Sequence, residues 1–211
     1  MRVKDYMTKN VITVEPDVRL TEVISIMESN DFHRVPVVDS NNVYQGLITE
    51  EIIANNSPSS ASSLSIYEMN YLLDKQTAGQ LMTTEAHTVD EDLTIEAAAA
   101  QMHDYGLSVL IVVDEQNKVI GIITDKDIFA ALIELTGYRQ AGARLELKVE
   151  DKVGVLHEIT GILSGLGVGI SHLYIADRDG TNSLLIVQTD TENGQEVLQV
   201  LESKGYDVSI I

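Results

Sequence analysis

The chain has 211 residues, of which 44% are hydrophobic and 22% are charged. This is ordinary globular usage, so composition excludes a wholly disordered chain, and the length suffices for two compact domains. Acidic residues number 33 against 14 basic ones, a formal net charge of -19 that disfavours nucleic acid and anionic membrane surfaces as partners. A phosphorylated ligand therefore requires a local basic pocket.

The sequence contains no cysteine, which excludes disulfides, thiolate nucleophiles and cysteine-type zinc sites. No stretch approaches 18 apolar residues, and the first five residues are polar apart from Met1 and Val3. We therefore expect a cytoplasmic protein with no membrane partner.

Residues 1–136 contain an internal repeat. Met7-Thr8 aligns with Met82-Thr83, a shift of 75 residues, and the register persists without a gap for more than 40 residues. Such a register indicates two copies of one structural unit. Further matched pairs are Val14 and Val89, Leu20 and Ile95, Met27 and Met102, Val37 and Val112, Gly46 and Gly121, and Ile48 and Ile123.

Each copy predicts a helix followed by a hairpin. Apolar residues recur at helical spacing over 20–27 and 95–102. Two short apolar runs follow, at 35–38 and 43–48 in the first copy, and turn-forming residues separate them. The second copy repeats this hairpin over 109–123, so the unit is of the α/β class.

A serine-rich stretch at 55–63 separates the copies and leads into a predicted helix. Residues 65–68 fit a capping box, and Leu64, Tyr67 and Tyr71 lie at helical spacing around it. An alternative is that the serine-rich stretch is a disordered linker.

The pattern changes at Arg144. Leu145, Leu147 and Val149 alternate with charged residues, which predicts a strand with one exposed face. A helix over 156–166, strands over 168–176 and 183–189, a helix around 197–201 and a strand over 206–211 follow. The order βαββαβ predicts a ferredoxin-like domain, and the stretch 137–142 is its natural boundary.

These patterns divide the chain into five segments: repeat 1 at 1–54, a linker with a helix at 55–78, repeat 2 at 79–136, a linker at 137–143 and a C-terminal domain at 144–211. The twin repeats, each ending in Gly, an apolar residue, Ile and Thr, resemble a CBS-domain pair, or Bateman-type module. The last segment, whose helix opens at 150–156, resembles an ACT domain. The whole order is similar to the acetoin-utilisation (AcuB-like) CBS-ACT regulators.

The resemblance implies that an adenosine compound binds between the two repeats, with ribose held by a Thr-x-x-Asp motif. Thr124, Lys126 and Asp127 belong to an intact copy of this motif, whereas residues 49–52 read Thr-Glu-Glu-Ile and lack the acceptor. We therefore expect one competent ribose site. Its base-side wall is expected from strand residues of the second copy: Thr88, Val89, Leu110 and Ile111. Alternatively, Asp127 is a helix cap and Lys126 a solvated surface lysine.

The same resemblance implies that a His-Arg pair faces ligand phosphates, and His33 and Arg34 occupy that position. The matching residues of the second copy are Ser108 and Val109, so ribose and phosphate recognition combine into one composite site. The alternative is that His33 and Arg34 pair with surface carboxylates, which are abundant.

In ACT domains, the resemblance implies, an amino acid binds between two copies, against the loop before the first helix and the following strand. The matching positions are Asp151, Val153, Gly154, Val155, Leu156, Gly169 and Ile170. Val153 stands where Pro is common and Gly169 where Asn is common in the family. An ACT domain that only dimerises is an equal alternative.

An enzyme is not expected, because the five histidines are scattered without metal-ligand spacing and the glycines match no phosphate-binding loop. Two hypotheses remain. The first is a homodimeric regulator that senses an adenosine ligand such as AMP, ADP or ATP, requires no cofactor and acts on an unknown protein partner. The second is an assembly module with vestigial ligand sites. A role in acetoin metabolism is implied by the resemblance alone.

Overall fold

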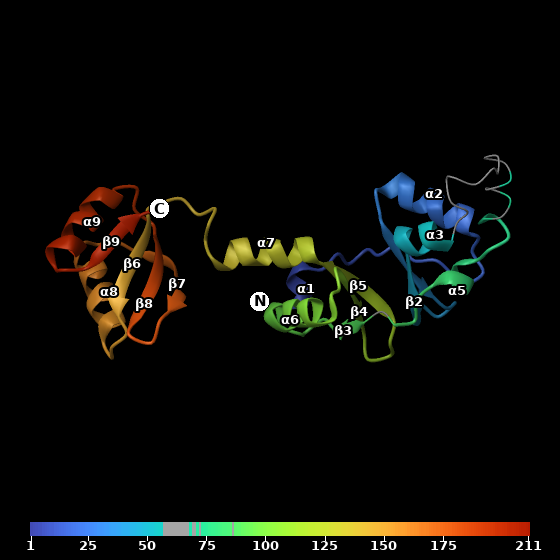
Figure 1. Ribbon diagram of the computed structural model, residues 1–211, viewed down its shortest axis with the longest axis horizontal. Coiled ribbons are helices and arrows are strands. Elements are labelled where there is room, and N and C mark those ends of the chain that lie inside the picture. Colours follow the sequence, from blue (N-terminus) through green and yellow to red (C-terminus); the bar gives the residue numbers. More distant parts are fainter. Residues whose placement is uncertain (57–67, 69–70, 72, 86) are drawn as a thin grey trace. The chain divides into compact units, whose positions relative to one another are not determined.

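The computed structural model describes residues 1–56, 68, 71, 73–85 and 87–211 (Figure 1). It divides into two compact units, Met1–Phe129 and Ala130–Ile211, and the division falls inside one helix. The predicted helix after the serine-rich stretch lies mostly outside the described residues.

The first repeat forms a helix and a hairpin, as its periodicity predicts. Helix α2 (Leu20–Asn30) buries the stripe of Leu20, Val23 and Met27 because these side chains recur on one helix face. Strands β1 (Arg34–Val38) and β2 (Tyr44–Thr49) pair in an antiparallel hairpin. The hairpin leads into α3 (Glu50–Asn56).

The second repeat forms the same unit, and the mixed α/β fold is confirmed. Helix α6 (Ile95–Tyr105) buries Ile95, Ala98 and Met102. Strand β4 (Val109–Val113) lies between β3 (Thr88–Asp90), which is parallel to it, and β5 (Val119–Thr124), which is antiparallel. Helix α7 (Asp125–Leu135) follows.

The two repeats exchange their leading segments. The segment with α1 (Val3–Tyr6) packs on the second repeat, where Thr8 and Ile122 exchange main-chain hydrogen bonds of 2.9 and 3.0 Å. The segment with α5 (Ala78–Leu81) packs on the first repeat, where Thr83 and Leu47 exchange two bonds of 2.9 Å. Each copy therefore completes the other, and the pair forms a single compact unit.

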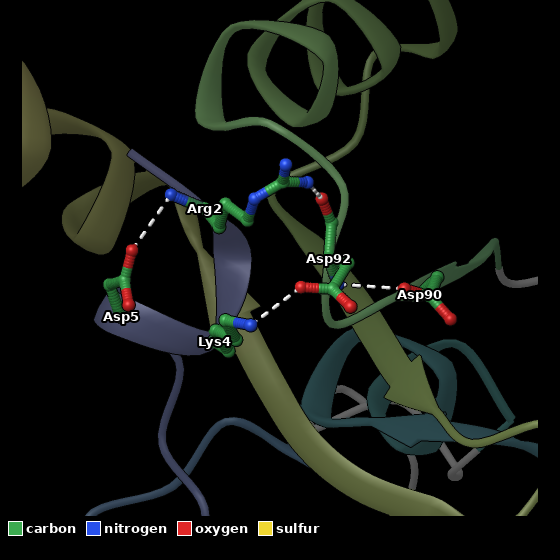
Figure 2. Close-up of polar contacts among 5 residues, drawn as sticks. All are labelled: Arg2, Lys4, Asp5, Asp90 and Asp92. Carbon is green, nitrogen blue, oxygen red and sulfur yellow. Dashed lines mark hydrogen bonds and ion pairs between the residues drawn. The ribbon is translucent and has the colours of Figure 1, made fainter.

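Polar contacts hold the first exchanged segment (Figure 2). The Lys4 ammonium lies 2.6 Å from the Asp92 carboxylate, and the Arg2 guanidinium donates to the Asp92 carbonyl oxygen. The Arg2 main-chain N–H donates to Asp5, and the Asp92 main-chain N–H donates to Asp90. The hydrogen bond from Lys4, and then its charge, lower the pKa of Asp92, so this contact is fully formed above the ordinary carboxyl pKa and is lost as the pH falls through the lowered value.

Two repeated glycines make the exchange possible. A Cβ on Gly46 would lie 2.7 Å from the main-chain oxygen of Thr83 and 2.8 Å from the Met82 sulfur. A Cβ on the matching Gly121 would collide with the sulfur of Met7. The Met-Thr sequence of each copy thus packs on the glycine of the other copy.

A shared core joins the two hairpins. It contains Val38, Tyr44 and Leu47 from the first repeat with Val109, Ile111 and Val119 from the second. Burial raises the pKa of Tyr44.

The second unit is a four-stranded antiparallel sheet covered on one face by two helices (Figure 1). The strand order is β7-β8-β6-β9, which confirms the ferredoxin-like prediction. The core between helices and sheet includes Leu145, Leu147, Ile159, Leu163 and Leu201, all fully buried. The elements are β6 (Arg144–Glu150), α8 (Val155–Gly165), β7 (Ile170–Arg178), β8 (Asn182–Thr189), α9 (Gly194–Ser203) and β9 (Asp207–Ile210).

Residues before β6 also contact this sheet. The Arg144 guanidinium donates to the Thr136 carbonyl oxygen at 2.9 Å and to the Tyr174 hydroxyl at 2.6 Å, and lies over the Tyr138 ring at 5.8 Å. The Gln188 amide donates to the Gln140 carbonyl oxygen at 3.4 Å. These contacts attach the stretch 136–140 to the second unit.

We predict that Gly46→Ala lowers the free energy of unfolding of the first unit by about 1–3 kcal/mol, because the nearest obstacle is a main-chain oxygen that cannot move aside. Urea unfolding measures the change. The control is Gly161→Ala in α8, where a Cβ has nothing within 4 Å and the helix gains up to about 1 kcal/mol. Equal stability of the Gly46→Ala variant and the wild type would contradict the close packing of Met82 and Thr83 on this glycine.

Candidate functional site

A cleft of about 220 Å³ lies between the two repeats of the first unit. One wall comes from the segment after α1 and from the start of β1, and the other from the end of β5 and the start of α7. The described residues that line it are Thr8, Asn10, Val11, Ile12, Asp31, Phe32, His33, Arg34, Pro36, Ile122, Thr124, Asp125 and Lys126. The cleft thus combines apolar, basic, acidic and hydroxyl groups from both repeats.

Thr124 and Asp127 are fixed by hydrogen bonds at the start of α7. The Asp127 carboxylate oxygen Oδ2 accepts from the Thr124 main-chain N–H at 2.7 Å and from its hydroxyl at 2.8 Å. In the first repeat, the Thr49 hydroxyl instead accepts from the Ile52 main-chain N–H at 3.2 Å. Asp127 is the third residue of α7 and bonds back to Thr124, which directly precedes the helix, so it takes part in the cap without being the N-cap residue that the alternative names. Its Oδ2 is already used within the chain.

The basic groups of the cleft have different partners. His33 Nδ1 lies 2.9 Å from the Glu50 carboxylate, and the Arg34 guanidinium donates to the Ser108 hydroxyl at 2.9 Å. In the described part of the chain, no hydrogen bond or ion pair of the Lys126 ammonium is recorded. His33 thus has the carboxylate partner that the surface-pairing alternative expects, whereas Arg34 reaches the opposite repeat.

Two acidic residues, Asp31 and Asp125, line the same cleft. Asp31 ends α2 with a left-handed backbone (φ 56°), and the matching residue of the second repeat is Gly106 (φ 64°). A non-glycine residue in this conformation is uncommon, although Asp tolerates it better than most. With His33, Arg34 and Lys126, the cleft presents charges of both signs.

The apolar wall of this cleft differs from the predicted one. Val89, Leu110 and Ile111 are buried in the strands of the second repeat, and Thr88 is exposed at the start of β3; none of these four lines the cleft that contains Thr124. The sequence prediction drew the wall and the ribose motif from the same copy. The exchange of leading segments instead brings residues of the first copy to this position.

The first repeat supplies that apolar wall through Val11, Ile12, Phe32 and Pro36, and Ile122 of the second repeat adds to it. Pro36 matches Ile111 at the shift of 75, so this cleft is lined at the predicted strand position by the residue of the first copy. The sequence contained one usable signal, the proline that interrupts an otherwise repeated apolar strand.

The candidate effector residues of the second unit lie at the start of α8 and of β7. Asp151 pairs with Arg178 at 3.5 Å, and Val153 is fully exposed. Gly154 is the N-cap of α8 with a left-handed backbone (φ 97°) and no capping side chain. Val155 is buried and Leu156 is 40% exposed in the first turn that follows.

The other two candidate residues, Gly169 and Ile170, lie where β7 begins. The Gly169 main-chain N–H donates to the Asp190 carboxylate at 2.8 Å, and the Asp190 main-chain N–H donates back to the Gly169 carbonyl oxygen at 3.1 Å. A carboxylate of the chain itself thus occupies the main-chain N–H of Gly169, one of the positions expected to line an amino-acid site.

Among the described residues, no group of three or more His, Asp or Glu side chains is arranged to hold a metal ion. Within the same residues, every helix is too short or too polar to cross a bilayer.

The fold defines a pair of tandem α/β repeats with a cleft between them, followed by a ferredoxin-like module. The family model for the CBS domain matches residues 3–58 and 78–134, more than half of the chain, and the model for the ACT domain matches residues 143–205. The chain belongs to the CBS domain family and carries a C-terminal ACT domain.

A curated relative, uncharacterized protein MJ1404 of Methanocaldococcus jannaschii, is 33% identical over 132 residues, which are 61% of this chain. The chain spans 27% of that relative's length, and 22% to 24% of the next curated relatives. Among solved structures, the CBS domain pair of protein MJ0100 in complex with 5′-methylthioadenosine and S-adenosyl-L-methionine is 26% identical (TM-score 0.52), covering 66% of this chain and 98% of that one. The putative acetoin utilization protein AcuB of Vibrio cholerae is 26% identical (TM-score 0.52), covering 64% and 92%.

We predict that Asp127→Ala lowers the free energy of unfolding by about 1 kcal/mol, because the Thr124 N–H and hydroxyl lose their acceptor at the start of α7. Denaturant unfolding measures the loss. Lys126→Ala is the control, since its ammonium has no partner among the described residues, and its effect is expected to stay within about 0.5 kcal/mol. A change no larger in Asp127→Ala than in Lys126→Ala would show that the cap contributes nothing to stability.

Proposed function

We propose that the protein is a non-catalytic regulator that binds one adenosine-type ligand in the cleft between its CBS repeats and thereby changes how it engages a metabolic partner. The observation that carries the proposal is the convergence of Thr124, His33, Arg34 and Lys126 on one cleft. The bound adenosine compounds named for the MJ0100 domain pair support the ligand class.

Each wall of the cleft would recognise one part of such a ligand. The adenine ring would lie against Val11, Ile12 and Pro36, in place of the four strand residues predicted from the second copy. Ribose hydroxyls would approach the start of α7, where the second carboxylate oxygen of Asp127, Oδ1, has no hydrogen bond recorded in the described part of the chain. Arg34 and Lys126 would contact an anionic group.

The mixed charge of the cleft sets the range of ligands. His33, Arg34 and Lys126 favour the phosphates of AMP, ADP or ATP, whereas Asp31 and Asp125 would tolerate the cationic sulfonium of S-adenosylmethionine. Because both signs are present, we include both kinds of ligand in the proposal. The cleft would therefore bind an adenosine compound, and the relative influence of the basic and acidic side chains would decide whether an anionic or a cationic compound binds more tightly.

The remaining features of the proposal rest on family likeness. We propose a cytoplasmic homodimer, and the AcuB neighbour supports a role in acetoin or related carbon metabolism. An amino acid at the ACT domain would use the start of α8, at Gly154, Val155 and Leu156, rather than the N–H of Gly169.

A second candidate function is an assembly module without a physiological ligand. The observation that favours it is that three expected ligand-binding groups already have partners in the chain: His33 with Glu50, Arg34 with Ser108 and Gly169 with Asp190. The exposed apolar side chains Val153 and Leu156 are also suited to contact with another chain.

We predict that at least one of AMP, ADP, ATP, S-adenosylmethionine and 5′-methylthioadenosine raises the melting temperature of the protein. At a concentration of one hundred times Kd the stabilisation is about 2.7 kcal/mol, a rise of roughly 5–10 °C. Asp127→Asn, which can keep the bonds to Thr124 but lacks the charge, is expected to lose most of this rise.

The matched control for that variant is Asp104→Asn, which removes the same charge from the exposed surface of α6 and is expected to keep the full rise. If none of the five compounds shifts the wild-type protein, the sensor proposal fails and the assembly module is favoured.

A further inference from the structure

The two clefts that a perfect twofold repeat would generate have different charged groups at one position. His33 matches Ser108 and Glu50 matches Asp125 at the shift of 75. In both copies the main chain is the same: Glu50 N–H donates to the His33 carbonyl oxygen at 3.0 Å, and Asp125 N–H donates to the Ser108 carbonyl oxygen at 3.2 Å. The main chain alone therefore holds Glu50 next to His33, whatever their side chains do.

In the first copy the two side chains are also hydrogen-bonded, imidazole to carboxylate; the second copy has a serine in place of the histidine. His33 Nδ1 and Glu50 Oε2 are 2.9 Å apart, and both side chains are more than half exposed. His33 also lines the cleft, whereas Glu50 does not. The hydrogen bond therefore joins His33, in the wall of the cleft, to Glu50, which does not line the cleft.

The bond fixes which ring nitrogen of His33 carries a proton. A carboxylate only accepts hydrogen bonds, so Nδ1 must be the donor in this pair. While the pair is intact, this donor is not available to a phosphate oxygen, which needs a donor of its own. Glu50 thus occupies the His33 donor that an anionic ligand would use.

We propose that Glu50 is an intramolecular competitor for the anionic group of the ligand and so determines which adenosine compounds the cleft accepts. This inference rests on the proposed function of the cleft. A phosphate must displace the Glu50 carboxylate from His33 before it can use that donor, whereas a compound without a phosphate leaves the pair intact. Glu50 therefore lowers the affinity for AMP relative to uncharged adenosine compounds.

The expected effect is moderate because the pair is exposed and water screens it. Replacement of Glu50 by Gln removes the negative charge and keeps the size of the side chain. The Gln side chain carries an amide that does not hold the Nδ1 proton as firmly, so the ring can turn or exchange its tautomer. We expect AMP to bind Glu50→Gln about 2–5-fold more tightly than the wild type, consistent with the usual strength of an exposed charged pair.

The test is isothermal titration calorimetry of the full-length protein with AMP and with 5′-methylthioadenosine, which has no phosphate. Glu51→Gln is the matched control, because Glu51 is the next residue of α3, is exposed and changes the net charge equally. We expect a gain for AMP in Glu50→Gln, less than a twofold change in Glu51→Gln, and no change for 5′-methylthioadenosine in either variant.

A double variant separates an effect through His33 from a general effect of charge. In a His33→Ala background, Glu50→Gln is expected to give no further gain for AMP. Equal gains in Glu50→Gln and Glu51→Gln, or an equal gain for 5′-methylthioadenosine, would overturn the inference while leaving the cleft as an adenosine site. Absence of binding by both compounds to the wild type and to Glu50→Gln would overturn the inference together with the proposed function.

Discussion

The reciprocal packing of each repeat's leading segment on the other repeat is the constraint on which the cleft depends. Main-chain bonds between Thr8 and Ile122, and between Thr83 and Leu47, fasten the two copies symmetrically. The first of these contacts brings the segment after Thr8 beside the end of β5. Neither copy alone contains both the apolar wall and the Thr124 motif, so the cleft exists only in the pair.

Although the main chains of the two copies are arranged symmetrically, their side chains have diverged, so the two equivalent positions differ in chemistry. Asp127 caps α7, whereas its counterpart Ile52 has no carboxylate, and His33 stands opposite a serine in the second copy. Main-chain geometry is conserved between the copies even where the side chains differ, as the bonds of Glu50 and Asp125 illustrate. The repeated arrangement of the two copies therefore depends on glycines and main-chain hydrogen bonds, so other side chains can differ between the copies without disturbing it.

The sequence predicted the elements well because periodicity reports which face of a helix or strand is buried. It located α2, α6 and the strands of both hairpins, and the order of the second unit. It did not predict α1 and α5, which are only four residues long, or the exchange, because periodicity does not reveal which partner covers a buried face. The same gap explains why the predicted base wall named Ile111 where Pro36 lines the cleft, and why the pairing of Gly169 with Asp190, 21 residues apart, was not foreseen.

We propose that divergence between the copies leaves one competent adenosine site in each chain. The most direct test is the stoichiometry of binding, measured by equilibrium dialysis of the wild-type protein against whichever adenosine compound stabilises it, at concentrations far above Kd. We expect saturation at one ligand per chain. Saturation at two ligands per chain would contradict the proposal, because the first copy, whose sequence is Thr-Glu-Glu-Ile, would then bind a ligand without the Thr-x-x-Asp motif.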